Sequence, residues 1–272
     1  MTASPPWRCV LTIAGSDSGG GAGVQADLKT FAAHGLHGLS AIAALTAQNT
    51  RAVTAVHTPP ADFLRAQIDA VFDDFDIGAV KLGMLASAEL IETVAAALSH
   101  HRPGNIVLDP VMVASSGARL LDPAALDALR RLLPMATVIT PNIPEAELLV
   151  GHAIADHDQA EQALDELTKL GAGAVLLKGG HLPGDPVIDR LAEGGRVHRF
   201  RHPRLMLDGH GSGCTLASAI AASLCRGLHL AAACEQAGHY LHGALAAAYR
   251  PGRSAISVLD HFWRNAPAGG AR

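Results

Sequence analysis

A glycine-rich stretch from Asp208 to Thr215 leads into a run of small residues that predicts a buried helix. Glycines before a helix leave several backbone N–H groups free to point at one position, where the helix dipole adds positive potential. Such a nest binds anions, and around a transferring phosphoryl group it would stabilise the charge on the oxygens. The same field would lower the pKa of the Cys214 thiol, so we expect a thiolate near neutral pH. The alternative is a glycine-rich turn with a buried structural cysteine.

Three further polar clusters each follow a predicted strand. Asn142 and Glu145 open a predicted helix, and an amide and a carboxylate one turn apart can organise a hydrated Mg²⁺. Asp109 ends a second strand with another carboxylate, and Lys178 ends a third with a cation suited to phosphate oxygens. Singly, these residues are better explained as a helix cap, a turn aspartate and an exposed lysine. Together, at one edge of a parallel sheet, they supply what phosphoryl transfer needs.

The elements that would hold these side chains alternate between strands and helices. Strands are predicted at 9–14, 39–45, 53–56, 79–82, 106–108, 138–140 and 174–177. Helices are predicted at 25–34, 59–72, 88–100, 123–133, 145–150 and 159–170, with Asp122 as an N-cap. A hairpin at 187–200 and two helices, 213–226 and 230–248, follow. This order predicts an α/β fold with a mostly parallel sheet and helices on both faces.

Composition limits the class of protein. The 272 residues are 49% hydrophobic and 17% charged, which predicts one globular domain over residues 1–272. The net charge of −4 is mixed along the chain and predicts no nucleic-acid partner, and no apolar run reaches membrane-spanning length. The four cysteines form no CxxC pair, which argues against a disulfide framework or a zinc site, and no signal peptide is evident. We therefore expect a cytoplasmic protein.

The first glycine-rich loop, from Gly15 to Gly23, has a GxGxxG-like pattern that also occurs in dinucleotide-binding folds. Those folds place an acidic residue at the end of the second strand, about 20 residues on. Here the second predicted strand ends in Thr46-Ala47-Gln48, without an acid, and the chain has no GxxxxGK[ST] loop. Close approach of backbone to another ligand is the preferred interpretation.

The segment from Gly209 to Cys214 resembles the anion-hole motif of the ribokinase-like kinases. Sugar kinases end this motif in Asp, whereas the hydroxymethylpyrimidine (phosphate) kinases of thiamin synthesis and one branch of pyridoxal kinases end it in Cys. The similarity to the thiamin-pathway members covers about residues 9 to 263. Its other motifs are 14–17, 20–27, 47–50, 81–85, 108–112, 140–145 and 178–181.

This resemblance implies a ribokinase-like three-layer α/β/α sandwich that uses ATP and Mg²⁺. It implies two successive phosphorylations of 4-amino-5-hydroxymethyl-2-methylpyrimidine, ending at the diphosphate, by an enzyme that is commonly a homodimer. The pyrimidine pocket that it implies comprises Gln48, Gly15, Ala22, Asp27, Met84 and Val111.

For the phosphoryl group, the resemblance implies that Lys178 contacts ATP phosphates and that Cys214 acts as the base. Gly211, Ser212 and Gly213 would form the anion hole, while Asp109, Asn142 and Glu145 would handle Mg²⁺, the two carboxylates through water.

Two other functions stay open at this stage. A pyridoxal or pyridoxine kinase would share the cysteine and the anion hole. A non-catalytic sensor would bind the pyrimidine without turning over ATP, although Lys178, Glu145 and Cys214 are all present. The chain departs from the family pattern at Asp208-Gly209, where Asn-Thr is usual, and at Ser212, where Thr is usual.

Overall fold

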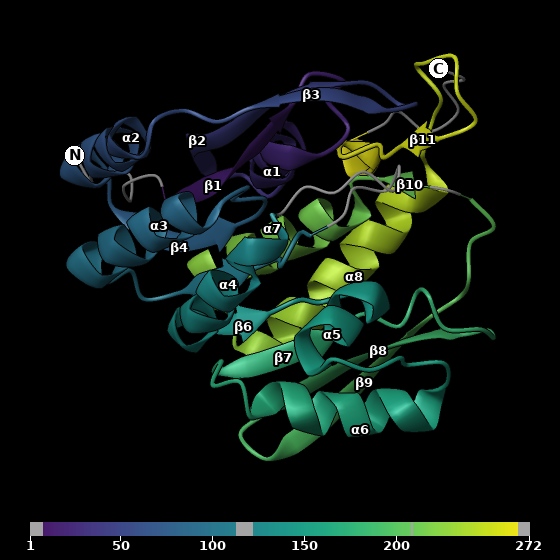
Figure 1. Ribbon diagram of the computed structural model, residues 1–272. Coiled ribbons are helices and arrows are strands. Elements are labelled where there is room, and N and C mark those ends of the chain that lie inside the picture. Colours follow the sequence, from purple (N-terminus) through teal and green to yellow (C-terminus); the bar gives the residue numbers. More distant parts are fainter. Residues whose placement is uncertain (1–7, 113–121, 208, 266–272) are drawn as a thin grey trace, which may run out of the picture.

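The computed structural model describes residues 8–112, 122–207 and 209–265. A nine-stranded sheet crosses the molecule in the order β3-β2-β1-β4-β5-β6-β7-β8-β9 (Figure 1). Neighbours from β2 to β7 run parallel, whereas β3, β8 and β9 each pair antiparallel to the preceding strand at the two ends of the sheet. The strands are β1 (Cys9–Asp17), β2 (His37–Gln48), β3 (Val53–His57), β4 (Ile77–Leu82), β5 (Ile106–Leu108), β6 (Val138–Ile139), β7 (Ala174–Leu177), β8 (Val187–Glu193) and β9 (Arg196–His202).

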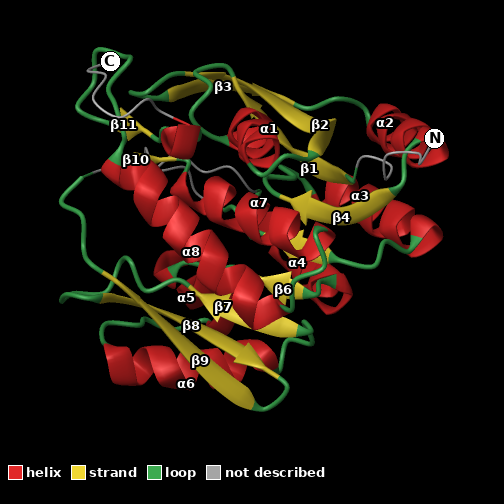
Figure 2. Cartoon of the chain, turned by 180° about the vertical axis from the view of Figure 1, so that it is seen from behind, coloured by secondary structure: helices red, strands yellow, loops and turns green. Residues whose placement is uncertain are grey.

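Helices cover both faces of this sheet. Alternate residues of β1 enter different cores, since Leu11 and Ile13 pack on one side and Val10 on the other. On the first side lie α2 (Ala61–Asp74), α3 (Ala88–His101), α4 (Leu126–Leu132), α5 (Ile143–Val150) and α6 (His157–Thr168), as Figure 1 shows. On the other lie α1 (Gly23–Ala33), α7 (Ser212–Cys225) and α8 (Leu230–Ala246), seen in front in Figure 2. The predicted three-layer α/β/α sandwich is confirmed.

The first strand is longer than predicted. The sequence analysis ended it at Ala14 and placed Gly15 in a loop, but the strand continues through Asp17. After an irregularity at Ala14/Gly15, residues 15–17 pair with residues 44–46 of β2. The strand β2 is likewise extended to Gln48 by pairing with β3. These additions depend on partner strands, which the local apolar pattern does not reveal.

The predicted helix 123–133 is divided into a 3₁₀ turn at Pro123–Ala125, α4 and a second 3₁₀ turn at Leu133–Met135. Asp122, the predicted N-cap, caps the first 3₁₀ turn, where its carboxylate accepts a hydrogen bond from the Ala124 N–H at 3.0 Å, whereas the N-cap of α4 itself is Ala125.

A two-stranded parallel sheet that the sequence analysis missed lies at the start of α7. It pairs β10 (Gly209–His210) with β11 (Ser257–Val258). The His261 ring that follows β11 lies 3.1 Å from the Thr215 hydroxyl, and the Tyr240 hydroxyl donates to the His261 carbonyl. Residues far along the chain thus hold the first turn of α7.

Candidate active site

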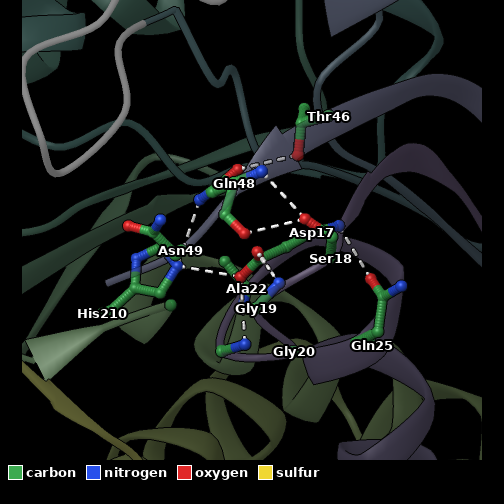
Figure 3. A network of polar contacts seen from close by, with 12 residues as sticks. Asp17, Ser18, Gly19, Gly20, Ala22, Gln25, Thr46, Gln48, Asn49 and His210 are labelled. Carbon is green, nitrogen blue, oxygen red and sulfur yellow. Dashed lines mark hydrogen bonds and ion pairs between the residues drawn. The ribbon is translucent and has the colours of Figure 1, made fainter. Parts of the chain in front are cut away.

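The end of β1 organises the first glycine-rich loop (Figure 3). The buried Asp17 carboxylate accepts hydrogen bonds from the backbone N–H groups of Gly19, Gly21 and Ala22 at 2.7–3.0 Å. Its Oδ2 also lies 2.9 Å from His210 Nε2. Burial alone would raise the pKa of Asp17, but the hydrogen bonds from His210 and the loop outweigh it and hold this pKa below its usual value. The ionised Asp17 carboxylate therefore holds the first glycine-rich loop in place through the backbone N–H groups of that loop.

Gln48 lies beside this loop at the end of β2. Its backbone N–H and carbonyl oxygen both bond to the Ser18 hydroxyl, at 2.8 and 2.7 Å. Its side-chain amide lies between the Thr46 hydroxyl, 3.0 Å away, and His210 Nε2, 3.2 Å away (Figure 3). The half-buried amide is thus held on two sides and still faces the site.

The helix α7 begins with an exposed set of backbone donors. Its N-cap, Gly211, has a φ of 87°, and a Cβ there would overlap the Gly21 carbonyl oxygen. The first N–H groups of a helix have no intrahelical acceptor, so those of Ser212, Gly213 and Cys214 are available to an anion. The predicted nest therefore lies directly against the first glycine-rich loop.

The ends of β5, β6 and β7 bring the predicted charges together. Lys178 Nζ lies 3.0 Å from Asp109 Oδ1 and 3.8 Å from Glu145 Oε2, and Thr140 donates to the same Asp109 oxygen at 3.1 Å. A Cβ at Gly213 would lie 3.2 Å from Lys178 Nζ and 3.3 Å from Asp109 Oδ2. The cation and a carboxylate are therefore at the first turn of α7, next to the nest.

Glu145 and Lys178 titrate differently in this cluster. Burial, opposed by Lys178 and reinforced by Asp109, raises the pKa of Glu145 to about 7. Burial alone would lower the pKa of Lys178, but the carboxylates of Asp109 and Glu145 outweigh it and hold this pKa above its usual value. The cluster thus places two carboxyl groups, Asp109 and Glu145, beside one ammonium, Lys178. A second cation bound there would balance the negative charge of the two groups when both are ionised.

Asn142 has a local role in this structure. Its side chain accepts from the Glu145 N–H at 2.9 Å, while Glu145 Oε2 accepts from the Asn142 N–H at 2.8 Å. This reciprocal pair is a capping box, which satisfies two donors at the start of α5. The explanation of Asn142 as a helix cap thus describes its contacts, and the same bonds fix the Glu145 carboxylate beside Lys178.

Asp27 lies beneath the site, where the resemblance implied a residue lining the pyrimidine pocket. Its fully buried carboxylate accepts from both Thr12 and Ser218 and pairs with the equally buried Lys81 at 2.9 Å. These partners come from β1, α7 and β4, so Asp27 joins α1 to three other elements. The Asp27 carboxylate raises the pKa of Lys81, overcoming the opposite effect of burial.

The expected thiolate at Cys214 is contradicted in the ligand-free protein. Burial raises the pKa of the Cys214 thiol to about 11, and the carboxylates of Asp27 and Asp109 add to this effect. The positive charge of Lys81 and the Gly23 backbone act in the opposite direction but are outweighed. The sequence analysis counted the field of the helix but neither the burial of the thiol nor the two carboxylates near it.

The other predicted pocket residues lie near the ends of β1, β4 and β5. Gly15 packs against Met84, since a Cβ at Gly15 would lie 3.0 Å from the Met84 sulfur. Ala22 donates to Asp17, and Val111 follows Asp109 with a backbone bond to it at 2.8 Å. The departure at Asp208 lies outside the described residues.

Several polar residues of the site were given no role in the sequence analysis. Asp17 and His210 stood within the quoted motifs, and Asp17 ends a strand, which was the signal that identified Asp109 and Lys178. Lys81 and Thr140 also stood within the quoted motifs, and Thr140 ends the predicted strand 138–140. Their buried partners, Asp27 and Asp109, become visible only when the strands are assembled.

Comparison with known proteins decides the family. The model of the phosphomethylpyrimidine kinase family matches residues 17–259. The chain belongs to this family. It is 48% identical over 263 residues to the hydroxymethylpyrimidine/phosphomethylpyrimidine kinase of Rhizobium meliloti, covering 94% of this chain and 98% of the relative. It is 50% identical to the thiamine biosynthesis bifunctional protein of Geobacter sulfurreducens, of which it spans about half, 51%.

Solved structures agree on the fold. The Bacillus subtilis pyridoxal kinase, solved as an ADP complex, matches with a TM-score of 0.88 and 32% identity, covering 95% of this chain and 99% of the kinase. The phosphomethylpyrimidine kinase family is therefore related in structure to pyridoxal kinases, and this member has the ribokinase-like fold of both. No helix within the described parts of the chain is long and apolar enough to cross a membrane.

Proposed function

We propose that this family member phosphorylates the hydroxyl of 4-amino-5-hydroxymethyl-2-methylpyrimidine with ATP and then phosphorylates the resulting monophosphate, for thiamin biosynthesis. One observation carries the proposal. The N-terminal nest of α7, the Lys178 ammonium and the Asp109 carboxylate meet at Gly213, within 3.3 Å of a Cβ placed there. An anion site, a cation and a carboxylate at one point suit a phosphoryl group in transfer.

The anion hole and Lys178 have complementary roles in this proposal. Backbone N–H groups of Ser212 and Gly213 donate to the oxygens of the transferring group, since they have no intrahelical acceptor. Lys178 neutralises ATP phosphate oxygens from the end of β7, beside the anion hole, and its elevated pKa keeps it charged. The nucleotide complex of the related Bacillus pyridoxal kinase supports ATP as the donor.

The carboxylates of Asp109 and Glu145 suit Mg²⁺. Mg²⁺ takes one or two carboxylates together with waters and substrate phosphates, so a site made entirely of protein ligands is not required. Within the described ranges no group of three or more His, Cys, Asp or Glu could hold a metal ion. Asp109 and Glu145 would hold the ion through water, and Mg²⁺ bound there would offset the charge of the ATP phosphates.

For the acceptor, we propose that Gln48 hydrogen-bonds the aminopyrimidine, with Gly15, Ala22, Met84 and Val111 around the ring. Gln48 suits this role because its amide carries both donors and acceptors and lies at the mouth of the first loop. The flexible Met84 thioether can pack on the ring beside the bare Gly15 backbone.

Cys214 is proposed to accept the proton of the alcohol. Its thiol is protonated in the ligand-free protein, and the Asp109 carboxylate is one cause. A cation at Asp109 would counter that effect and lower the pKa of Cys214 toward the working range. The monophosphate has a second pKa of about 6, so it is already largely a dianion and needs no base.

The alternative substrate class is a pyridoxal-type alcohol. Relatives named for the pyrimidine kinase reach 48% identity to this chain, against 32% for the Bacillus pyridoxal kinase. The decisive test measures ATP consumption with the hydroxymethylpyrimidine, its monophosphate and pyridoxal in parallel. Turnover of pyridoxal alone would reject the proposed substrate, and binding of the pyrimidine without turnover would establish a sensor.

We further propose a homodimer of single-domain subunits in the cytoplasm. The edge strand β3 exposes most of its residues, and Leu45 and Val56 on this edge are 49% and 45% exposed. The proposed site residues lie in or shortly after strands of one sheet, or in α1, α5 and α7 and at the N-caps of these helices, which supports a single domain. The proposed use of ATP as the phosphoryl donor supports a location in the cytoplasm. Light scattering after size-exclusion chromatography tests the dimer.

A further inference from the structure

The side-chain amide of Gln48 contacts His210 and Thr46, and the hydrogen bonds of these two residues determine where their protons lie. His210 Nε2 lies 2.9 Å from Asp17 Oδ2 and 3.2 Å from the amide of Gln48. The Asp17 carboxylate already accepts three backbone N–H groups and is ionised, so it can only accept from His210. His210 Nε2 must therefore carry a proton.

That proton decides which atom of Gln48 can face His210. An amide nitrogen placed there would set a donor against a donor, whereas the amide oxygen can share the Nε2–H with Asp17 as the longer branch of a three-centre hydrogen bond. Amide oxygen and nitrogen have nearly the same shape, so their positions follow from their partners. A rotation of the Gln48 amide by half a turn exchanges Oε1 and Nε2 and places the oxygen toward His210 Nε2.

The contact of the Gln48 amide with Thr46, on its other side, independently indicates the same orientation of the amide. The Thr46 hydroxyl donates its one proton to the Ser16 carbonyl at 2.8 Å. It then has only lone pairs for Gln48, 3.0 Å away, and so needs the amide NH₂ there. His210 and Thr46 thus demand the same orientation, with Oε1 toward His210 and Nε2 toward Thr46.

We propose that His210, held by Asp17, is a specificity-determining positioning residue that fixes the Gln48 amide so that it recognises an amino group next to an unprotonated ring nitrogen. In this orientation the amide keeps one lone pair on Oε1 and one N–H for a ligand. The oxygen accepts from the 4-amino group of the pyrimidine, and the N–H donates to the adjacent ring nitrogen. This inference rests on the proposed function.

The test compares two acceptors of the same shape and opposite hydrogen-bond pattern. In the 4-oxo analogue a carbonyl replaces the amino group, and the adjacent ring nitrogen carries a proton. The wild type should prefer the 4-amino alcohol in kcat/KM. His210→Phe keeps a ring packed on Gly21 but removes the proton that orients Gln48. It should reduce this preference by about 5- to 100-fold, since the amide can then turn to serve either acceptor.

Ser18→Ala is the matched control, because Ser18 bonds the backbone of Gln48 and not its amide. It should change the rates on both acceptors together and leave their ratio intact. Thr46→Val is the second variant, should His210→Phe fold poorly, and it should also reduce the ratio. An unchanged ratio in both His210→Phe and Thr46→Val, or an equal loss on both acceptors, would overturn the proposal.

A direct measurement on the wild type is independent of turnover. Nitrogen-15 NMR of the imidazoles should show His210 protonated at Nε2, and an unprotonated Nε2 would overturn the proposal. If the wild type phosphorylates neither pyrimidine, the proposed function fails, while the NMR result still decides how Gln48 is oriented.

Discussion

The protonation of Glu145 has a measurable effect on stability. In the ligand-free protein the pKa of Glu145 is raised from its ordinary value of 4.5 to about 7, chiefly by burial. The folded state therefore binds more protons than the unfolded state between these values, and this group's stabilising contribution falls as pH rises through the window. At 1.36 kcal/mol for each pH unit, the loss amounts to ~3 kcal/mol by pH 8. Glu145→Gln should remove it, because glutamine stays neutral and can still complete the capping box with Asn142.

The assay is urea unfolding of wild type and Glu145→Gln at pH 5, 6, 7 and 8, without Mg²⁺ or nucleotide. The variant should gain ~3 kcal/mol relative to wild type between pH 5 and 8. Subtracting the unfolding free energies of the two proteins removes the pH dependence contributed by other groups. One such group is His261, whose pKa is lowered to about 4, chiefly by burial. Glu89→Gln, which removes an exposed carboxylate from the first turn of α3, controls for the loss of one charge. If the curves of wild type and Glu145→Gln run parallel, burial does not hold Glu145 protonated and the reasoning fails.

Four further changes test the site. Gln48→Leu should raise KM for the pyrimidine about 5- to 100-fold without changing KM for ATP, because a buried polar contact is worth ~1–3 kcal/mol; steady-state kinetics with a normal pyrimidine KM would reject the pocket. Lys178→Ala should depress kcat on both acceptors alike, since Lys178 acts on the donor, and full turnover of either acceptor in a coupled assay would argue against that role. Cys214→Ala should slow the alcohol step by about 10²–10⁴-fold in single-turnover experiments and the phosphate step far less. An equal loss on both acceptors would mean that Cys214 does not act as a base. Gly211→Ala should destabilise the protein by at least ~1–2 kcal/mol, because φ is 87° and the Gly21 carbonyl blocks a Cβ; unchanged thermal unfolding would contradict this.

The arrangement of helices on both faces of a parallel sheet could be predicted because the chain alternates apolar strands with helices, most of them of ten or more residues. Residues 15–17 could not be assigned to β1, since Gly-Ser-Asp has no strand pattern and is held by β2 after an irregularity. The pair β10 and β11 was likewise invisible, because two residues in each strand carry no periodicity and the partners lie 48 positions apart, from Gly209 to Ser257. Local pattern predicts elements, whereas strand ends depend on tertiary partners.

The site was predictable where a charged residue directly follows a strand, as Asp109 and Lys178 do. The protonation of Cys214 was not, because it depends first on burial in the assembled fold and then on Asp27, 187 positions earlier in the chain, and on Asp109. The pairing of Asp17 with His210 was missed for the same reason, since these residues meet only when β1 lies against the start of α7.

The parallel pairing of β10 with β11 has a consequence for synthesis of the chain. A nascent chain that has reached Arg250 contains every residue proposed to bind or transfer phosphate, including all of α7. It still lacks Ser257, Val258 and His261, which pair with Gly209 and His210 and contact Thr215. The anion hole is therefore completed only after this late segment emerges from the ribosome. Translation arrested before Ser257 should yield a chain that holds the proposed site residues yet cannot trap a phosphoryl group.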